Sequence, residues 1–138
     1  MEDQQRLEQL VTEINQLQQQ GETIAQQIEQ LNKSAADLQT AKEAVEGLKG
    51  AVGKETLIPI GAGCFITTEL KSEDVIVGVG ADVAVKRSHE EALKTLETDI
   101  EEVRKLTQSL TEQLNKVNDH IRQRRPEAEK LMAQQKQQ

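Results

Sequence analysis

Residues 55–86 read ETLIPIGAGCFITTELKSEDVIVGVGADVAVK, two β-branched runs that are broken by glycines and separated by a polar turn. Short runs of this kind, bounded by glycine and polar residues, are typical of β-strands. The stretch predicts two β-hairpins, one turning at Gly61-Ala62-Gly63 and one at Gly80-Ala81-Asp82. Pro59 has no backbone donor, so it is expected at a sheet edge or at a strand start.

Neighbouring residues within each run are apolar, so both faces of each predicted hairpin carry apolar side chains. An isolated hairpin is only marginally stable in water, and its edges are open to pairing. We therefore expect the segment 55–87 to complete a sheet or barrel with other subunits. The residues expected to form this assembly surface are Leu57, Ile58, Ile60, Phe65, Ile66, Val75, Ile76, Val77, Val79, Val83 and Val85.

Residues 1–49 predict a first long helix, because apolar residues recur there at heptad spacing. Gly21 is the one break in this seam, and the register loosens after Leu38. A glycine cluster from Gly47 to Gly53 is expected to end the helix. The a and d positions are Leu7, Leu10, Ile14, Leu17, Gly21, Ile24, Ile28, Leu31, Ala35 and Leu38.

Residues 88–133 predict a second long helix. Ser88 and Glu91 have the spacing of a capping box, which marks a helix start. Pro126 is expected to kink or interrupt the helix, since it lacks a donor and clashes with the preceding turn. The a and d positions, of which only Thr107 and Arg124 are polar, are Leu93, Leu96, Ile100, Val103, Thr107, Leu110, Leu114, Val117, Ile121, Arg124, Ala128 and Leu131.

A heptad-patterned helix needs a partner along its apolar seam, and the other helix of the same chain is the nearest one. We expect a single domain over residues 1–138 of a mainly α class: a long antiparallel two-helix coiled coil with two central hairpins that join an oligomeric β-barrel platform. Parallel coiled coils between chains are the alternative, which would require an extended middle segment.

The composition excludes several classes of protein. With one phenylalanine and no tyrosine or tryptophan in 138 residues, the chain has few of the side chains that usually fill a wide core. The net charge of -7 argues against nucleic acid as a partner. The polar, acidic N-terminal residues and the lack of an apolar run of about 20 residues argue against a signal peptide and a membrane span. We expect a cytoplasmic protein.

No motif in the sequence indicates catalysis, a cofactor or a metal. The two Gly-x-Gly pairs at Gly61 and Gly78 lack the third glycine of a dinucleotide fingerprint, and no Walker motif is present. His89 and His120 are far apart and are expected on the surface. Cys64 lies in an apolar β run and is expected as a buried structural thiol.

Binding is expected at the free ends of the two helices, where the seam frays and Arg124 and Pro126 weaken it. Aliphatic residues with a methionine suit adaptable hydrophobic contact. The alternative is that these residues only complete the coiled-coil core. The basic cluster Arg122, Arg124 and Arg125 is expected to solvate the coiled-coil end, with an acidic partner as the alternative. The candidate binding residues are Leu7, Leu10, Val11, Ile14, Val117, Ile121, Leu131 and Met132.

The run ETLIPIGAGCFI from Glu55 to Ile66, followed by VIVGVGADVAV from Val75 to Val85, resembles the central segment of archaeal prefoldin α subunits. The opening MEDQQRL at residues 1–7 is similar to theirs as well. Asp82 departs from this pattern, where glycine is expected, and Cys64 stands where a small or β-branched residue is usual. Aspartate tolerates a turn, so the hairpin is still expected.

The resemblance implies an ATP-independent chaperone, a holdase. It implies a hetero-hexamer of two α and four β subunits, so the partners would be prefoldin β subunits and a second α subunit. Hairpins would form a β-barrel platform, and coiled-coil tips would capture non-native polypeptides and deliver them to a group II chaperonin. Two alternatives remain at this stage: a structural or filament-forming prefoldin-like protein, and a cytoplasmic tether or adaptor.

Overall fold

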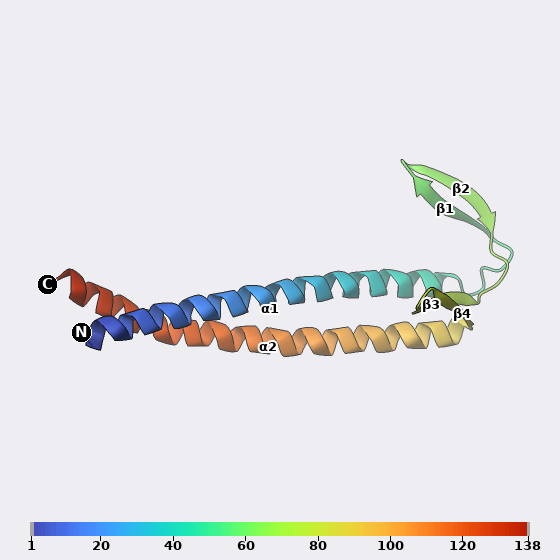
Figure 1. Ribbon diagram of the computed structural model, residues 1–138. Coiled ribbons are helices and arrows are strands. Elements are labelled where there is room, and N and C mark those ends of the chain that lie inside the picture. Colours follow the sequence, from blue (N-terminus) through green and yellow to red (C-terminus); the bar gives the residue numbers. More distant parts are fainter. Residues whose placement is uncertain (1, 138) are drawn as a thin grey trace. The chain divides into compact units, whose positions relative to one another are not determined.

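The computed structural model describes residues 2–137, which form two long helices and two β-hairpins (Figure 1). The contacts divide the described chain into a first unit, residues 2–34 with 103–137, and a second unit, residues 35–102. The mainly helical fold class with two hairpins is confirmed. The elements are α1 (Glu2–Gly47), β1 (Glu55–Gly61), β2 (Cys64–Glu69), β3 (Val75–Gly80), β4 (Val83–Arg87) and α2 (His89–Lys136).

In the first unit, the two helix segments run antiparallel. Arg6 is paired with Glu127, whereas Glu13, further along α1, is paired with Arg124, further back along α2. Every predicted a and d position of this unit is buried or half-buried, while nearly all other positions are exposed. Contact between the two apolar stripes therefore holds the unit together, as the heptad pattern predicts.

Besides Arg124, two seam positions of the first unit carry no apolar side chain. Gly21 is buried, and a Cβ added to it would lie 3.6 Å from Leu114 Cδ1 and from Val117 Cγ1. The hydroxyl of Thr107 donates a hydrogen bond of 2.8 Å to the carbonyl of Val103, so it is satisfied within its own helix. The seam thus tolerates both residues without leaving a buried polar group unpaired.

The sequence predicts that Pro126 either kinks or interrupts the helix. The helix α2 continues through Pro126 as far as Lys136, so an interruption is the wrong one of these two outcomes. A proline in a helix removes one backbone hydrogen bond, here the one to the carbonyl of Arg122. Two residues later Ala128 is buried in the seam. Packing of the seam residues on both sides of Pro126 therefore outweighs the cost of the lost backbone hydrogen bond.

In the second unit, the capping box predicts the start of α2 correctly. The Ser88 hydroxyl accepts a hydrogen bond of 3.2 Å from the amide of Glu91, which satisfies one of the free donors of the first turn. Val45 and Ala92 are buried beside this start. The antiparallel arrangement holds here too: Val45 contacts His89, whereas Lys42, further back on α1, lies 3.9 Å from Glu97, further along α2.

His89 is half-buried and is not the solvated surface residue expected from the sequence. Its Nε2 lies 2.6 Å from the carbonyl oxygen of Val45, and it must donate because a carbonyl only accepts. The last carbonyls of a helix have no partner within the helix. His89 therefore caps the end of α1 from the first turn of α2, a role that no local pattern indicates.

The strands form two separate antiparallel hairpins, β1 with β2 and β3 with β4. Each turns through two residues in the left-handed region: Ala62 and Gly63 at φ 50° and 76°, and Ala81 and Asp82 at φ 51° and 60°. Positive φ at both central residues defines a type I′ turn, whose twist matches that of the strands. Both turns lie where the sequence predicts them, and Asp82 adopts the conformation for which glycine was expected.

The two hairpins also share an irregularity one residue before the turn. The register shifts between Pro59 and Gly61 in the first hairpin and between Gly78 and Gly80 in the second. Each shift leaves one apolar residue, Ile60 or Val79, outside the regular ladder. Such bulges increase the local twist of a strand and re-aim its side chains.

We predict that Ala62→Asn stabilises the first hairpin. Alanine at φ 50° is strained, by about 1 kcal/mol on the scale of left-handed conformations. The change places the sequence Asn-Gly in a type I′ turn, which that pair favours. Amide hydrogen exchange should show about five-fold greater protection in β1 and β2, since 1 kcal/mol corresponds to roughly that factor. The amides of β3 and β4 are the internal control, and lower protection in β1 and β2 would contradict the prediction.

Candidate assembly and client-binding surfaces

The hairpins present most of their apolar side chains to solvent. Leu57 is 67% exposed and Ile76 is 73% exposed. Val75, Val77 and Val85 are half-buried. The other residues of the predicted assembly surface that are exposed are Ile58, Ile60, Phe65, Ile66, Val79 and Val83.

Both faces of the first hairpin are apolar. Ile58 lies directly opposite Ile66, and Pro59 lies opposite Phe65, so the two pairs occupy opposite faces. Thr56 and Thr68 lie on the same face as the isoleucine pair, further from the turn, and their hydroxyls are 2.6 Å apart. A two-stranded hairpin has no layer to cover either face.

The second hairpin has one better-covered face. Val77 lies opposite Val85, and Val75 is on the same face two residues away, so the three half-buried valines belong together. The other face carries Ile76 opposite Lys86 and the small pair Gly78 and Ala84. The Lys86 ammonium lies 3.7 Å from Asp74, an exposed ion pair at the base of this hairpin.

The outer edges of both hairpins have free backbone groups, because each sheet has only two strands. Unpaired edges are a template for strand addition by another chain. Cys64, beside the first turn, is exposed, so the expectation of a buried thiol is wrong. The physical reason is that neither face of this hairpin is covered within the chain.

All eight candidate client-binding residues lie in the first unit, but they differ in access. Leu10 is fully buried at 0% exposure, and Val117 is also buried. Val11 and Met132 are 43% and 48% exposed. The other four are half-buried: Leu7, Ile14, Ile121 and Leu131. In this conformation the seam is closed around Leu10, and the accessible apolar surface consists mainly of Val11 and Met132.

Two interhelical ion pairs flank Leu10. The Arg6 guanidinium binds both carboxylate oxygens of Glu127, at 3.1 and 3.4 Å, and the Arg124 Nε lies 2.8 Å from Glu13 Oε2. The hydrogen bond with Glu127, together with its charge, raises the pKa of Arg6. Arg124 also donates to the carbonyl of His120 at 3.3 Å.

Sequence reasoning identified Arg124 as a polar seam residue but not its partner. Heptad spacing within one helix does not say which residue of the other helix faces it. Once the antiparallel register is known, opposite charges account for both ion pairs, Arg6 with Glu127 and Glu13 with Arg124. Ion pairs that are this exposed to solvent contribute little to stability. They set the register of the free end more than its stability.

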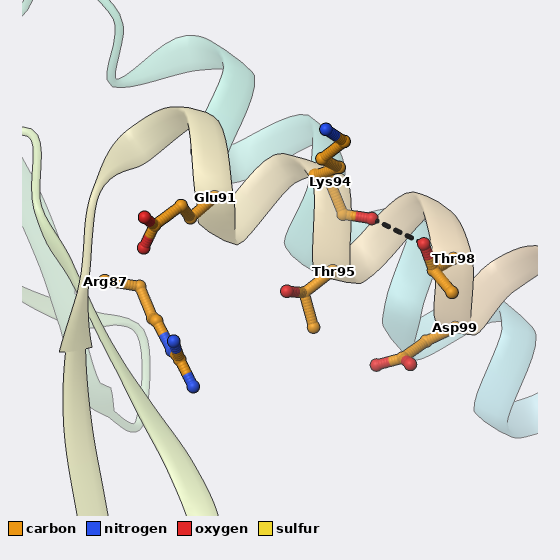
Figure 2. A pocket seen from close by; sticks show the side chains of 6 residues that line it. All are labelled: Arg87, Glu91, Lys94, Thr95, Thr98 and Asp99. Carbon is orange, nitrogen blue, oxygen red and sulfur yellow. Dashed lines mark hydrogen bonds between the residues drawn. The ribbon is translucent and has the colours of Figure 1, made fainter.

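A shallow groove of about 400 Å³ lies in the second unit, where β4 meets the first turns of α2 (Figure 2). Arg87 comes from the strand, and the other lining residues come from the helix: Glu91, Lys94, Thr95, Thr98 and Asp99. Thr98 donates to the Lys94 carbonyl at 2.9 Å, the contact drawn in Figure 2. Two cations and two anions line the groove, so it has no preference for either charge.

Within residues 2–137, no helix is long and apolar enough to cross a membrane. The same part of the chain contains no group of three or more histidine, cysteine, aspartate or glutamate residues arranged to hold a metal ion.

A family model for prefoldin subunits matches residues 17–134 of the chain. The chain belongs to the prefoldin family. It is 73% identical over 132 residues to prefoldin subunit alpha of Methanosphaera stadtmanae, a match that covers 96% of each chain. It is 36% identical to prefoldin subunit alpha of Methanobrevibacter smithii, over 96% of this chain and 92% of the relative. The resemblance to archaeal prefoldin α subunits that the hairpin motifs predicted is therefore confirmed.

Among solved structures, the prefoldin fold is found in a cryo-EM structure of filamentous PFD from Methanocaldococcus jannaschii. The TM-score is 0.69 at 23% sequence identity, and the match covers 81% of this chain and 94% of the other. At this identity the likeness concerns the fold, two helices with hairpins between them. The prefoldin fold thus survives extensive replacement of its side chains.

We predict that Leu10→Ala loosens the free end of this prefoldin chain, whereas Val11→Ala does not. Removing a fully buried leucine side chain costs about 2 to 5 kcal/mol. Val11 is nearly half exposed and loses little by truncation. Amide hydrogen exchange of residues 2–14 and 120–136 measures the difference. Equal protection in the two variants would show that Leu10 does not close the seam.

Proposed function

We propose that this prefoldin-family chain is one subunit of an ATP-independent molecular chaperone, a holdase. In this proposal the hairpins assemble it with a second copy and with prefoldin β subunits into a hexamer of two α and four β subunits. The free helix ends capture non-native polypeptides in the cytoplasm and deliver them to a group II chaperonin. One observation carries the proposal: the helices bury their apolar residues against each other, whereas the hairpins expose theirs to solvent.

The hairpins support assembly for an energetic reason. Eight large apolar side chains are exposed on two short hairpins, and burying each of them in an interface contributes about 1.5 to 3 kcal/mol. Free strand edges add backbone hydrogen bonds to the same interface. A monomer would leave this surface in water, where it favours uncontrolled association.

The free helix ends support weak, adaptable binding. Val11 and Met132 offer an aliphatic surface, and methionine adapts its shape to different contacts. One such end binds a client only weakly. Several ends that surround the same client raise the effective concentration of each further contact, so the assembly holds it much more tightly than one chain.

We predict that Leu57→Ser combined with Ile76→Ser abolishes assembly but leaves the helices folded. The two side chains are the most exposed of the hairpins, so their loss does not affect packing within the chain. Assembly should weaken by at least about ten-fold per side chain. Size-exclusion chromatography with light scattering, after mixing with a β-type subunit, measures the effect. The control is Val52→Ser, an exposed apolar residue outside the strands, and unchanged assembly of the double variant would contradict the prediction.

We predict that Val11→Ser combined with Met132→Gln reduces client holding by the assembled complex without changing its mass. Suppression of the aggregation of a chemically denatured protein measures holding. The control is Leu106→Gln, which removes a side chain of similar exposure, 53%, in the same unit but away from the free end. Removal of residues 1–12 and 118–138 is the stronger form of the test. Suppression that survives both changes would refute capture at the free ends.

A filament-forming role is the second candidate. It is favoured by the likeness of the fold to the filamentous PFD of Methanocaldococcus jannaschii. Open edges on both hairpins suit head-to-tail addition as well as closed assembly. Sizing with and without a β-type subunit separates the two: a discrete hexamer supports the holdase proposal, and a polydisperse series of the chain alone supports the filament.

A further inference from the structure

We propose that Glu73 is a positioning residue for assembly: its carboxylate fixes the connection between the two hairpins, residues 70–74, to the end of α1. The inference rests on the proposed function, because it concerns how the hairpins are presented to other subunits. In the second unit, Glu73 Oε1 accepts a hydrogen bond of 2.7 Å from the amide of Gly50, shortly after α1 ends at Gly47. Glu73 thus acts through the placement of the hairpins and not through their apolar surface.

The start of this connection continues the ladder of the first hairpin. The Leu70 carbonyl accepts a hydrogen bond of 2.8 Å from the amide of Gly53, and the Leu70 amide donates to the carbonyl of Lys54 at 3.2 Å. Lys54 directly precedes β1, and Leu70 directly follows β2. Leu70 is therefore fixed to the base of the first hairpin.

The end of the connection is held at the second hairpin. The Asp74 carboxylate lies 3.7 Å from the Lys86 ammonium on β4, and Asp74 directly precedes β3. The Asp74 amide donates to the Ser72 hydroxyl at 3.0 Å, which shapes the turn around Glu73. A side chain in the middle of this short connection can therefore act on both hairpins.

A carboxylate at this place needs a hydrogen-bond donor. The C-terminal end of a helix carries a partial negative charge, which disfavours an acidic side chain nearby. Glu73 is also half-buried and so has lost part of its contact with water. A hydrogen bond to an ionised acceptor is shorter and stronger than one between neutral groups, so the bond from the Gly50 amide offsets these costs.

Fixed placement matters because the two hairpins share no ladder. Their strands form two separate sheets, and both sheets expose apolar side chains that the proposed assembly would bury. An interface that uses both hairpins binds more tightly when their placement is set in advance, because less conformational freedom is lost on association. The bond between Glu73 and Gly50 supplies such preorganisation.

The test measures the rate at which the full chain associates with a fluorescently labelled prefoldin β subunit after rapid mixing. Glu73→Ala removes the acceptor and should slow association about five-fold, the factor expected from one net hydrogen bond. Association is slower when binding has to include a conformational change. Thermal unfolding of the helices should stay as in the parent, because Glu73 lies outside the seam.

Two further variants separate the contact from the charge. Glu73→Gln keeps an oxygen at the same reach without the charge, and it should associate within about two-fold of the parent. Glu73→Asp keeps the charge but is one methylene shorter, so it should associate as slowly as Glu73→Ala. The control is Asp37→Ala, which removes an exposed carboxylate earlier in α1, in the same unit, and should associate like the parent.

The proposal is overturned if Glu73→Ala associates as fast as the parent, or if Glu73→Gln is as slow as Glu73→Ala. Amide hydrogen exchange of β1 to β4 shows whether the hairpins stay folded in each variant. Loss of their protection in Glu73→Ala would assign Glu73 to hairpin folding, and this result would also overturn the positioning role.

The outcome also separates this inference from the proposed function. If Leu57→Ser with Ile76→Ser abolishes assembly while Glu73→Ala associates normally, the positioning role is refuted and assembly through the hairpins stands. If the parent chain itself does not associate with the β subunit, the proposed hexamer is refuted, and the role of Glu73 with it.

Discussion

The aliphatic seam between antiparallel helices is the interaction on which the rest of the described chain depends. Each helix buries one narrow stripe, and most seam residues are only half-buried because two helices cannot enclose a side chain from all sides. Among residues 2–137, only a few apolar side chains are buried, among them Leu10 and Ala128. This is how the chain folds with a single phenylalanine: it needs a long line of contacts, and no wide core.

The hairpins stand in contrast to the seam. Their turns are well determined, because positive φ at two consecutive residues selects one turn type and hence one register. A two-stranded hairpin has no second layer to cover its faces, however, so most of its apolar side chains are exposed. The half-buried valine face of the second hairpin is the exception. Local turn formation and strand pairing thus form each hairpin but do not cover its apolar side chains, which only other chains could bury. In the proposed function, assembly and client binding occupy different parts of one small protein.

Elements and turns were predictable to a large extent, because they depend on neighbours in sequence. The heptads located the seam, Ser88 with Glu91 located the start of α2, and the glycines located both turns. The errors occurred where distant contacts decide. Pro126 lies within a continuous helix because flanking residues pack, and Cys64 is exposed because nothing covers its hairpin. His89 is half-buried because it binds the carbonyl of Val45, 44 residues away.

By itself, the sequence determined the type and order of the elements, the stripe that each helix buries and the residues at each turn. These follow from periodicity, capping and backbone sterics, all of which act over a few residues. Only the tertiary structure decided which residues of the two helices face each other. That register pairs Arg6 with Glu127 and Glu13 with Arg124, and it closes the seam over Leu10 while Val11 stays exposed. It also sets Gly21 against Leu114 and Val117. The physical reason is that a heptad repeat fits several registers almost equally well, and the choice among them depends on charges and side-chain sizes about a hundred residues apart.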